Sequence, residues 1–197
     1  MKVLFHSMVK GFKRIALSFT KESILAGFFF FLVLCSWYIL RPVRNEMAVQ
    51  NSEILPYLLG IGALVMLALN PVYSWLASRK NLRGVLVGCY SFFISNLLVF
   101  IILWQFFDLS SSIMLSQIFY IWCNVYSFFV VSIFWVVIIN LFRGENAANV
   151  FGVIAAGGSI GAYLGSEISK QLASTFNESG IIFFTMIAIV FLSLALM

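Results

Sequence analysis

The sequence predicts an all-α membrane protein in which six transmembrane helices follow an amphipathic surface helix. Composition is the first observation: 62% of the 197 residues are hydrophobic and 10% are charged, with a mean hydropathy of +1.05. Soluble domains are nearer half apolar and a quarter charged, so a chain this apolar needs lipid as its solvent. The second observation is the spacing of six long apolar runs, and the third is an uneven distribution of basic residues.

The N-terminal segment, residues 1–22, has the pattern of a basic amphipathic helix. At about 100° per residue its apolar side chains fall on one face and its basic side chains on the other. The apolar face carries Leu4, Phe5, Met8, Phe12, Ile15 and Phe19, and the basic face carries Lys2, Lys10, Lys13, Arg14 and Lys21. This pattern is typical of a helix that lies on a membrane surface. A cleaved signal peptide fits poorly, because the following apolar run is too long and ends without a small-residue cleavage site.

A transmembrane domain is expected over 23–197. Its predicted spans are 23–40, 54–77, 85–107, 113–142, 147–173 and a sixth that starts near 181. The first helix can continue beyond Pro42, and the fourth is long enough to need tilt or a protruding end. The sixth run still continues at Met197 without a polar flank. We therefore expect this domain to be one half of a twelve-helix protein, with a second six-helix half as its partner.

Basic residues predict the orientation of these spans. With the N-terminus inside, nine lysines and arginines lie on the cytoplasmic side, and Arg41, Arg44 and Lys170 lie outside. Short cytoplasmic loops are enriched in such residues. We therefore expect a multi-pass protein of the cell (inner) membrane with a cytoplasmic N-terminus. The net charge of +5 is then a topology signal, with membrane lipid and not nucleic acid as the partner.

The chain is not expected to be an enzyme. Its three cysteines, Cys35, Cys89 and Cys123, lie in apolar runs without metal-ligand or disulfide spacing, and its one histidine, His6, has no partner in the pattern. No nucleophile has a base at helical spacing, and no phosphate-binding loop follows a strand. The sequence therefore predicts no catalytic residue, no metal site and no cofactor.

The fourth predicted helix carries a polar face. Gln117, Tyr120, Asn124 and Ser127 follow the spacing i, i+3, i+7, i+10, which places them on one side of a helix. Polar groups are costly in hydrocarbon, so this face should turn into the bundle. Two interpretations remain open: the side chains line a wet cavity, or they hydrogen-bond to neighbouring helices.

The fifth predicted helix carries a ridge of small residues. Gly157, Gly161 and Gly165 recur every four residues, and Gly158 pairs with Ala162. This pattern favours close helix packing, and a smooth ridge also lets helices move past one another during gating. A separate cluster, Arg79, Lys80 and Arg83, occupies the predicted cytoplasmic loop between the second and third spans.

Two arginines, Arg41 and Arg44, stand on either side of Pro42 near the outer end of the first span. In one interpretation both extend to the lipid headgroups, with Trp37 and Tyr38 in the interfacial aromatic belt. In the other, the helix continues through Pro42 and turns one or both guanidinium groups into the bundle. Arginine suits phosphate because its planar fork matches two oxygens at once.

Several segments resemble the ATP/ADP (nucleotide) translocase family, which is grouped with the major facilitator superfamily. They are "YILRPVRNEMAVQ" (38–50), "FYIWCNVYSFFVVSIFW" (119–135), "LFRGENAANVFGVIAAGGSIGAYLG" (141–165) and, in degenerate form, the loop "SWLASRKNLRG" (74–84). The resemblance implies the N-terminal half of a twelve-helix transporter with substrate between its halves. Arg44 matches a helix-one position implicated in holding phosphates, where the family residue is typically lysine. Asn45 replaces a usual aspartate, and Cys123–Asn124 occupies the region of an acidic residue in the nucleotide exchangers.

Composition, motifs and resemblance together predict a secondary transporter. It moves an anionic solute, such as a nucleotide in ATP/ADP-exchange style, by alternating access. Its expected substrate-binding residues are Arg44, Arg41, Gln117, Tyr120, Asn124 and Ser127. The alternative is a non-transporting six-helix scaffold or assembly subunit, in which the polar residues only join helices.

Overall fold

The computed structural model describes residues 20–106, 113–142, 147–175 and 180–196. They form long α-helices joined by short segments: α2 (Lys21–Gln50), α3 (Leu55–Ala77), α4 (Leu82–Phe106), α5 (Ile113–Leu141), α6 (Ala147–Thr175) and α7 (Gly180–Leu196), with a 3₁₀ turn, η1 (Ser52–Ile54), before α3. The predicted surface helix over 1–22 lies outside the described residues, except that Lys21 and Glu22 already belong to α2. Each predicted span corresponds to one of these helices.

Local capping explains where two helices begin. Thr20 Oγ1 accepts a hydrogen bond from the Ser23 backbone N–H at 3.2 Å, which caps α2. Asn81 Oδ1 accepts from the Gly84 N–H at 3.0 Å and caps α4 in the same way. The first helix does not end near Leu40 as its apolar run suggests; it continues through Pro42 to Gln50. This extension keeps Arg41 and Arg44 on helical backbone.

Four of the described helices are long and apolar enough to cross a membrane: Lys21–Val49, Leu55–Ala77, Leu82–Gln105 and Ile113–Leu141. The described part of the chain is all-α, and these helices are typical of a membrane-embedded protein. α7 contributes a shorter apolar helix, Phe184–Ala195. α6 is as long as α5 but carries many small and polar residues, with Glu167 and Lys170 near its end. The count of six spans therefore stays a prediction.

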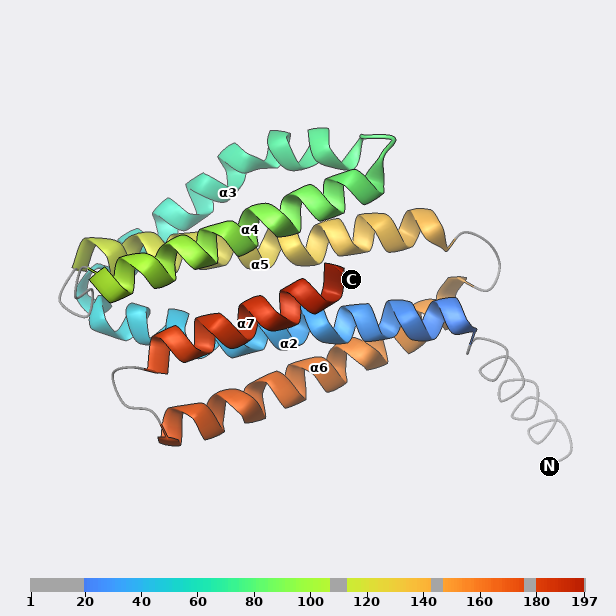
Figure 1. Cartoon of the computed structure of the whole chain (residues 1–197). Coiled ribbons are helices and arrows are strands. Elements are labelled where there is room, and N and C mark those ends of the chain that lie inside the picture. Colours follow the sequence, from blue (N-terminus) through green and yellow to red (C-terminus); the bar gives the residue numbers. More distant parts are fainter. Residues whose placement is uncertain (1–19, 107–112, 143–146, 176–179, 197) are drawn as a thin grey trace, which may run out of the picture.

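α2 is the central helix of the bundle. It packs against α5, α6 and α7, while α4 packs against α5 and α7. Figure 1 shows α3 at one edge of the molecule and α6 at the other, with α2, α7 and α5 between them. α3 makes its main contacts with α5 and few with α4, so most of its surface faces outward. Because α2 is central, one of its sides faces α6 and another faces α5.

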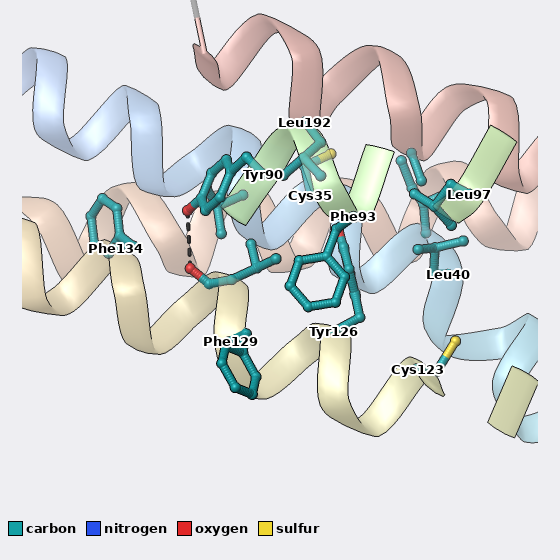
Figure 2. Packing of buried hydrophobic residues seen from close by; sticks show 14 of the residues in the cluster. Cys35, Leu40, Tyr90, Phe93, Leu97, Cys123, Tyr126, Phe129, Phe134 and Leu192 are labelled. Atoms are coloured by element: carbon teal, nitrogen blue, oxygen red, sulfur yellow. Dashed lines mark hydrogen bonds between the residues drawn. The ribbon is translucent and has the colours of Figure 1, made fainter. Parts of the chain in front are cut away.

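The core between α4 and α5 is largely aromatic. Phe93 meets the Tyr126 ring edge-on with centroids 5.4 Å apart, and Phe100 meets Phe119 in the same way at 5.0 Å. Figure 2 shows Tyr90 facing α5, where its hydroxyl donates to the Val130 carbonyl at 2.9 Å. The Tyr90 hydroxyl is thus paired with backbone, as hydrocarbon surroundings require, whereas the buried Trp122 Nε1 has no hydrogen-bond partner among the described residues.

Candidate functional site

Arg44 turns into the bundle toward α5. Its Nη1 donates to Asn124 Oδ1 at 3.0 Å, and its Nη2 donates to Asn45 Oδ1 at 3.0 Å. The guanidinium carbon lies 5.4 Å from the Trp37 ring centre and 5.9 Å from that of Tyr120, both within cation–π range. Its Nε is buried and has no hydrogen-bond partner. The group is thus held by neutral amides and aromatic faces.

A cavity of about 560 Å³ adjoins this arginine. Asn124 and Trp37, which both contact Arg44, also line the cavity. The remaining walls come from α2, α3 and α5: Leu34, Tyr38, Met66, Ser127, Phe128, Val131 and Ser132. Residues 34–38 lie near the middle of α2, and residues 124–132 lie near the middle of α5. The cavity therefore sits at mid-length of two long apolar helices.

The polar face of α5 divides into two parts. Asn124 and Ser127 line the cavity, and Ser127 Oγ donates to the Asn124 carbonyl at 2.9 Å. Tyr120 is buried beside Arg44. Gln117, one turn nearer the helix start, instead donates from Nε2 to Asn51 Oδ1 at 3.0 Å. Asn124 and Ser127 thus lie at the cavity, whereas Gln117 joins α5 to the residue that follows α2.

Asn51 is a buried polar residue near the candidate site that the sequence did not predict. It follows α2 directly, is 5% exposed, and donates from Nδ2 to the Met47 carbonyl and to Ser116 Oγ. Together with Gln117 it ties the end of α2 to the start of α5. A signal was available, because an asparagine at a helix C-terminus commonly hydrogen-bonds the last carbonyls.

Arg41 and Arg44 have different surroundings although they are three residues apart. Arg41 is exposed, and its guanidinium carbon lies 5.4 Å from the Tyr38 ring centre. Neither arginine is among the described residues that line the 560 Å³ cavity, but Arg44 contacts two that do, Asn124 and Trp37. Trp37 contacts Arg44 and lines the cavity.

Pro42 interrupts the backbone hydrogen bonding of α2. Proline has no N–H, so the Tyr38 carbonyl, four residues earlier, loses its helical hydrogen bond. Ser169 on α6 donates to that carbonyl at 3.1 Å and also approaches the Ile39 carbonyl at 3.3 Å. Ser169 is 2% exposed. A hydroxyl from a neighbouring helix therefore satisfies the backbone at the turn that carries both arginines.

The glycine ridge of α6 faces α2 and not the cavity. A Cβ at Gly157 or Gly161 would overlap the backbone of Gly27 or Phe31, and one at Gly165 would lie 2.7 Å from the Cys35 carbonyl oxygen. A Cβ at Gly158 would overlap the Phe30 ring. These contacts explain why the positions are glycine: α2 and α6 touch through their backbones.

The basic loop lies apart from Arg44. Arg79, Lys80 and Arg83 are exposed, and the Arg79 guanidinium carbon lies 3.8 Å above the Trp75 ring centre. Arg79 and Lys80 line a second, larger cavity between α3, α4 and α5. No group of three or more His, Cys, Asp or Glu side chains that could hold a metal ion occurs within the described ranges.

Comparison of the chain with protein-family models, with curated proteins and with solved structures gave no match. The resemblance to nucleotide translocases therefore stays an expectation that rests on the quoted segments, and the function has to be argued from the Arg44 site itself.

Proposed function

We propose that this protein is a secondary membrane transporter that binds an anionic solute at Arg44. The observation that carries the proposal is a guanidinium group held by neutral partners beside a cavity at mid-length of the helices. Nucleotides and other organic phosphates are the proposed class of solute, because the arginine fork matches phosphate oxygens.

The electrostatic argument rests on what surrounds Arg44. No carboxylate among the described side chains forms an ion pair with it; its partners are two amides and two aromatic rings. Arginine stays charged in proteins, and an uncompensated charge is costly in a low-dielectric interior. An anion that enters the cavity supplies the missing counter-charge. The two Nη groups, which donate to neutral amide oxygens, are the donors offered to that anion.

The residues that line the cavity suit a solute with both charged and aromatic parts. Asn124 and Ser127 offer hydrogen bonds, whereas Trp37, Tyr38 and Phe128 offer ring faces. Arg41 has a weaker case, because it is exposed and contacts Tyr38 on the outer side of the helix. In this proposal Arg44 binds the anion, Asn124 orients Arg44, and the rings pack on the remainder of the solute.

The finer expectations belong to the same proposal. α6 and α7 complete a six-span, major facilitator-type half, with the N-terminus in the cytoplasm of a cell (inner) membrane. A second six-helix half closes the cavity from the other side, and rocking of the halves alternates access to the site. No cofactor takes part, and transport is driven by solute or ion gradients and not by hydrolysis.

Uptake into liposomes tests the proposal. Full-length protein is reconstituted, and entry of radiolabelled ATP, ADP and phosphate esters is compared with that of uncharged adenosine. We expect uptake of the anions alone. Arg44→Ala removes a charged hydrogen-bond donor worth about 1.5–3 kcal/mol, so uptake at low solute concentration should fall roughly 10- to 150-fold.

Two variants serve as controls. Arg41→Ala removes an equal charge from the same helix turn and should leave uptake within about twofold, since its side chain is exposed. Arg44→Lys keeps the charge but loses the fork, so its uptake should fall between those of the wild type and Arg44→Ala. Normal uptake by Arg44→Ala would show that the anion binds elsewhere.

A non-transporting membrane scaffold is the second candidate. The hydrogen bonds from Gln117 to Asn51 and from Asn51 to Ser116 favour it, because these polar groups join helices without facing a cavity. If no phosphate ester enters the liposomes and none binds the purified protein, the scaffold becomes the better account of this chain.

A further inference from the structure

The larger cavity is a groove of about 1250 Å³ on a different face of α5 from the Arg44 site. α3, α4 and α5 form its walls, and α3 meets α4 through few residues, which leaves space between the two helices. Most of the lining is apolar, including Leu69 and Val72 from α3, Phe92 from α4, and Val125 and Phe129 from α5. The cavity residues of α5 at the Arg44 site are different ones, so the two spaces are distinct.

One end of the groove is basic. Arg79, Lys80 and Asn81 line it where α3 ends and α4 begins. The Trp75 ring holds the Arg79 guanidinium at 3.8 Å, which limits the freedom of that side chain. Lys80 is exposed beside it. Within the described residues no carboxylate lines this groove, so its positive charge is not neutralised there.

The depth of the groove matches one half of a bilayer. Its α4 wall runs from Gly84 to Phe93, nine helical steps of about 1.5 Å, or about 14 Å. The hydrocarbon core of a bilayer is about 30 Å thick, so each leaflet contributes about 15 Å. A lipid chain that enters at the basic end would therefore be covered for most of its depth in one leaflet.

We propose that this groove binds one anionic phospholipid. The lipid phosphate pairs with Arg79 and Lys80, and an acyl chain lies between α3 and α4 against Phe92 and Val125. Short loops rich in lysine and arginine lie on the cytoplasmic side, where anionic lipids are concentrated. Charge and depth thus favour a lipid of that leaflet over a second protein chain.

Lipid binding to the purified full-length protein in detergent, followed by native mass spectrometry, tests this inference. Dioleoyl phosphatidylglycerol and dioleoyl phosphatidylcholine have identical chains and differ in the headgroup. We expect one phosphatidylglycerol to remain bound with an affinity at least tenfold higher than that of phosphatidylcholine. Glycerol phosphate, which has the anionic group without the chains, should not displace it even in hundredfold excess.

Two pairs of variants separate the headgroup from the chain. Arg79→Ala/Lys80→Ala should abolish the preference for phosphatidylglycerol, whereas Arg83→Ala, a charge in the same loop that does not line the groove, should keep it. Gly88→Leu should lower the binding affinity of both lipids at least fivefold. Gly88 lines the groove and a Cβ there meets open space, so the leucine side chain would occupy the space of the acyl chain. Gly60→Leu, equally open but outside the groove, should have no effect.

Four results would overturn the inference. Equal retention of the two lipids would remove the headgroup site, and an equal effect of Arg83→Ala would reduce it to general surface charge. Displacement by glycerol phosphate would make the ligand a free phosphate. If Gly88→Leu instead dissociates a dimer on size-exclusion chromatography with light scattering, the groove holds a second copy of the chain.

Discussion

The two sides of α2 show opposite solutions to packing in an apolar medium. Toward α6, the backbones of Gly27 and Phe31 touch Gly157 and Gly161 so closely that a single Cβ has no room. Toward α5, the same helix presents Trp37 and Arg44 beside a 560 Å³ cavity. A close-packed joint and an open polar site therefore share one helix.

The two sides of α2 therefore differ in role: one packs against α6, and the other binds solute in the proposed function. A tight joint of small residues gains its stability from van der Waals contact and close backbone approach, and it excludes ligand and water. The open side gives up that contact and holds a charge with neutral partners. We infer that α2 and α6 move as one unit, while the α2–α5 side carries recognition.

The largest expected effect comes from filling the tight joint. Gly161→Leu places a side chain against the Phe31 backbone, which cannot move without separating α2 from α6. Overpacking of this kind costs about 1–3 kcal/mol or more. We expect Tm in detergent to fall by about 6–12 °C or the folded protein to be lost.

Gly152→Leu is the matched control for this prediction. It lies on the same helix, and a Cβ at that position meets nothing within 4 Å. Its Tm should stay within about 2 °C of the wild type. Equal destabilisation by both variants would mean that the glycines matter for helix conformation and not for the contact with α2.

Much of this arrangement could be predicted from the sequence, because hydrophobic runs delimit helices that lipid must surround. The apolar runs gave the ends of α3 and α5 to within one residue. The glycine ridge also predicted a close contact, but a repeat of small residues does not specify which helix it meets. Its partner, α2, depends on the three-dimensional path of the chain.

The candidate site was less predictable, since sequence spacing could not separate Arg41 from Arg44. Both follow the same apolar run, and only the position of Asn124 on α5 decides which guanidinium group has a partner. Asn51 and Ser169 were missed for a related reason. Each acts through a residue far away in the sequence, Gln117 for Asn51 and Tyr38 for Ser169.

A change of charge at Asn124 tests the open side of α2. Asn124→Asp gives Arg44 a carboxylate at hydrogen-bond distance, where an ion pair is worth about 4 kcal/mol at an effective dielectric of 20. The new carboxylate then neutralises the charge of Arg44. We expect the affinity for ATP or a phosphate ester to fall at least tenfold by equilibrium binding, with no decrease in Tm.

The opposite result would be equally informative. The expected resemblance to nucleotide exchangers implies an acidic residue in this region of helix four, whereas this sequence reads Cys123–Asn124. If Asn124→Asp instead gains ATP/ADP exchange, the electrostatic argument for Arg44 is wrong and the family arrangement is the better guide. Ser127→Ala, a cavity variant without change of charge, is the control.

The smallest effect is expected where the two sides of α2 are linked. Ser169 belongs to α6, yet its hydroxyl satisfies the Tyr38 carbonyl that Pro42 leaves free, nearly two turns before Arg44. Ser169→Ala leaves that partly buried acceptor unpaired, which costs about 1–2 kcal/mol, and Tm should fall by about 2–8 °C. Ser166→Ala on the same helix removes an exposed hydroxyl that bonds only the Ala162 carbonyl, and its Tm should not change measurably. Because the freed carbonyl lies on the same helix, within two turns of Arg44, Ser169→Ala should also lower solute affinity by two- to fivefold. A stability loss without any loss of affinity would show that the two sides of α2 act independently.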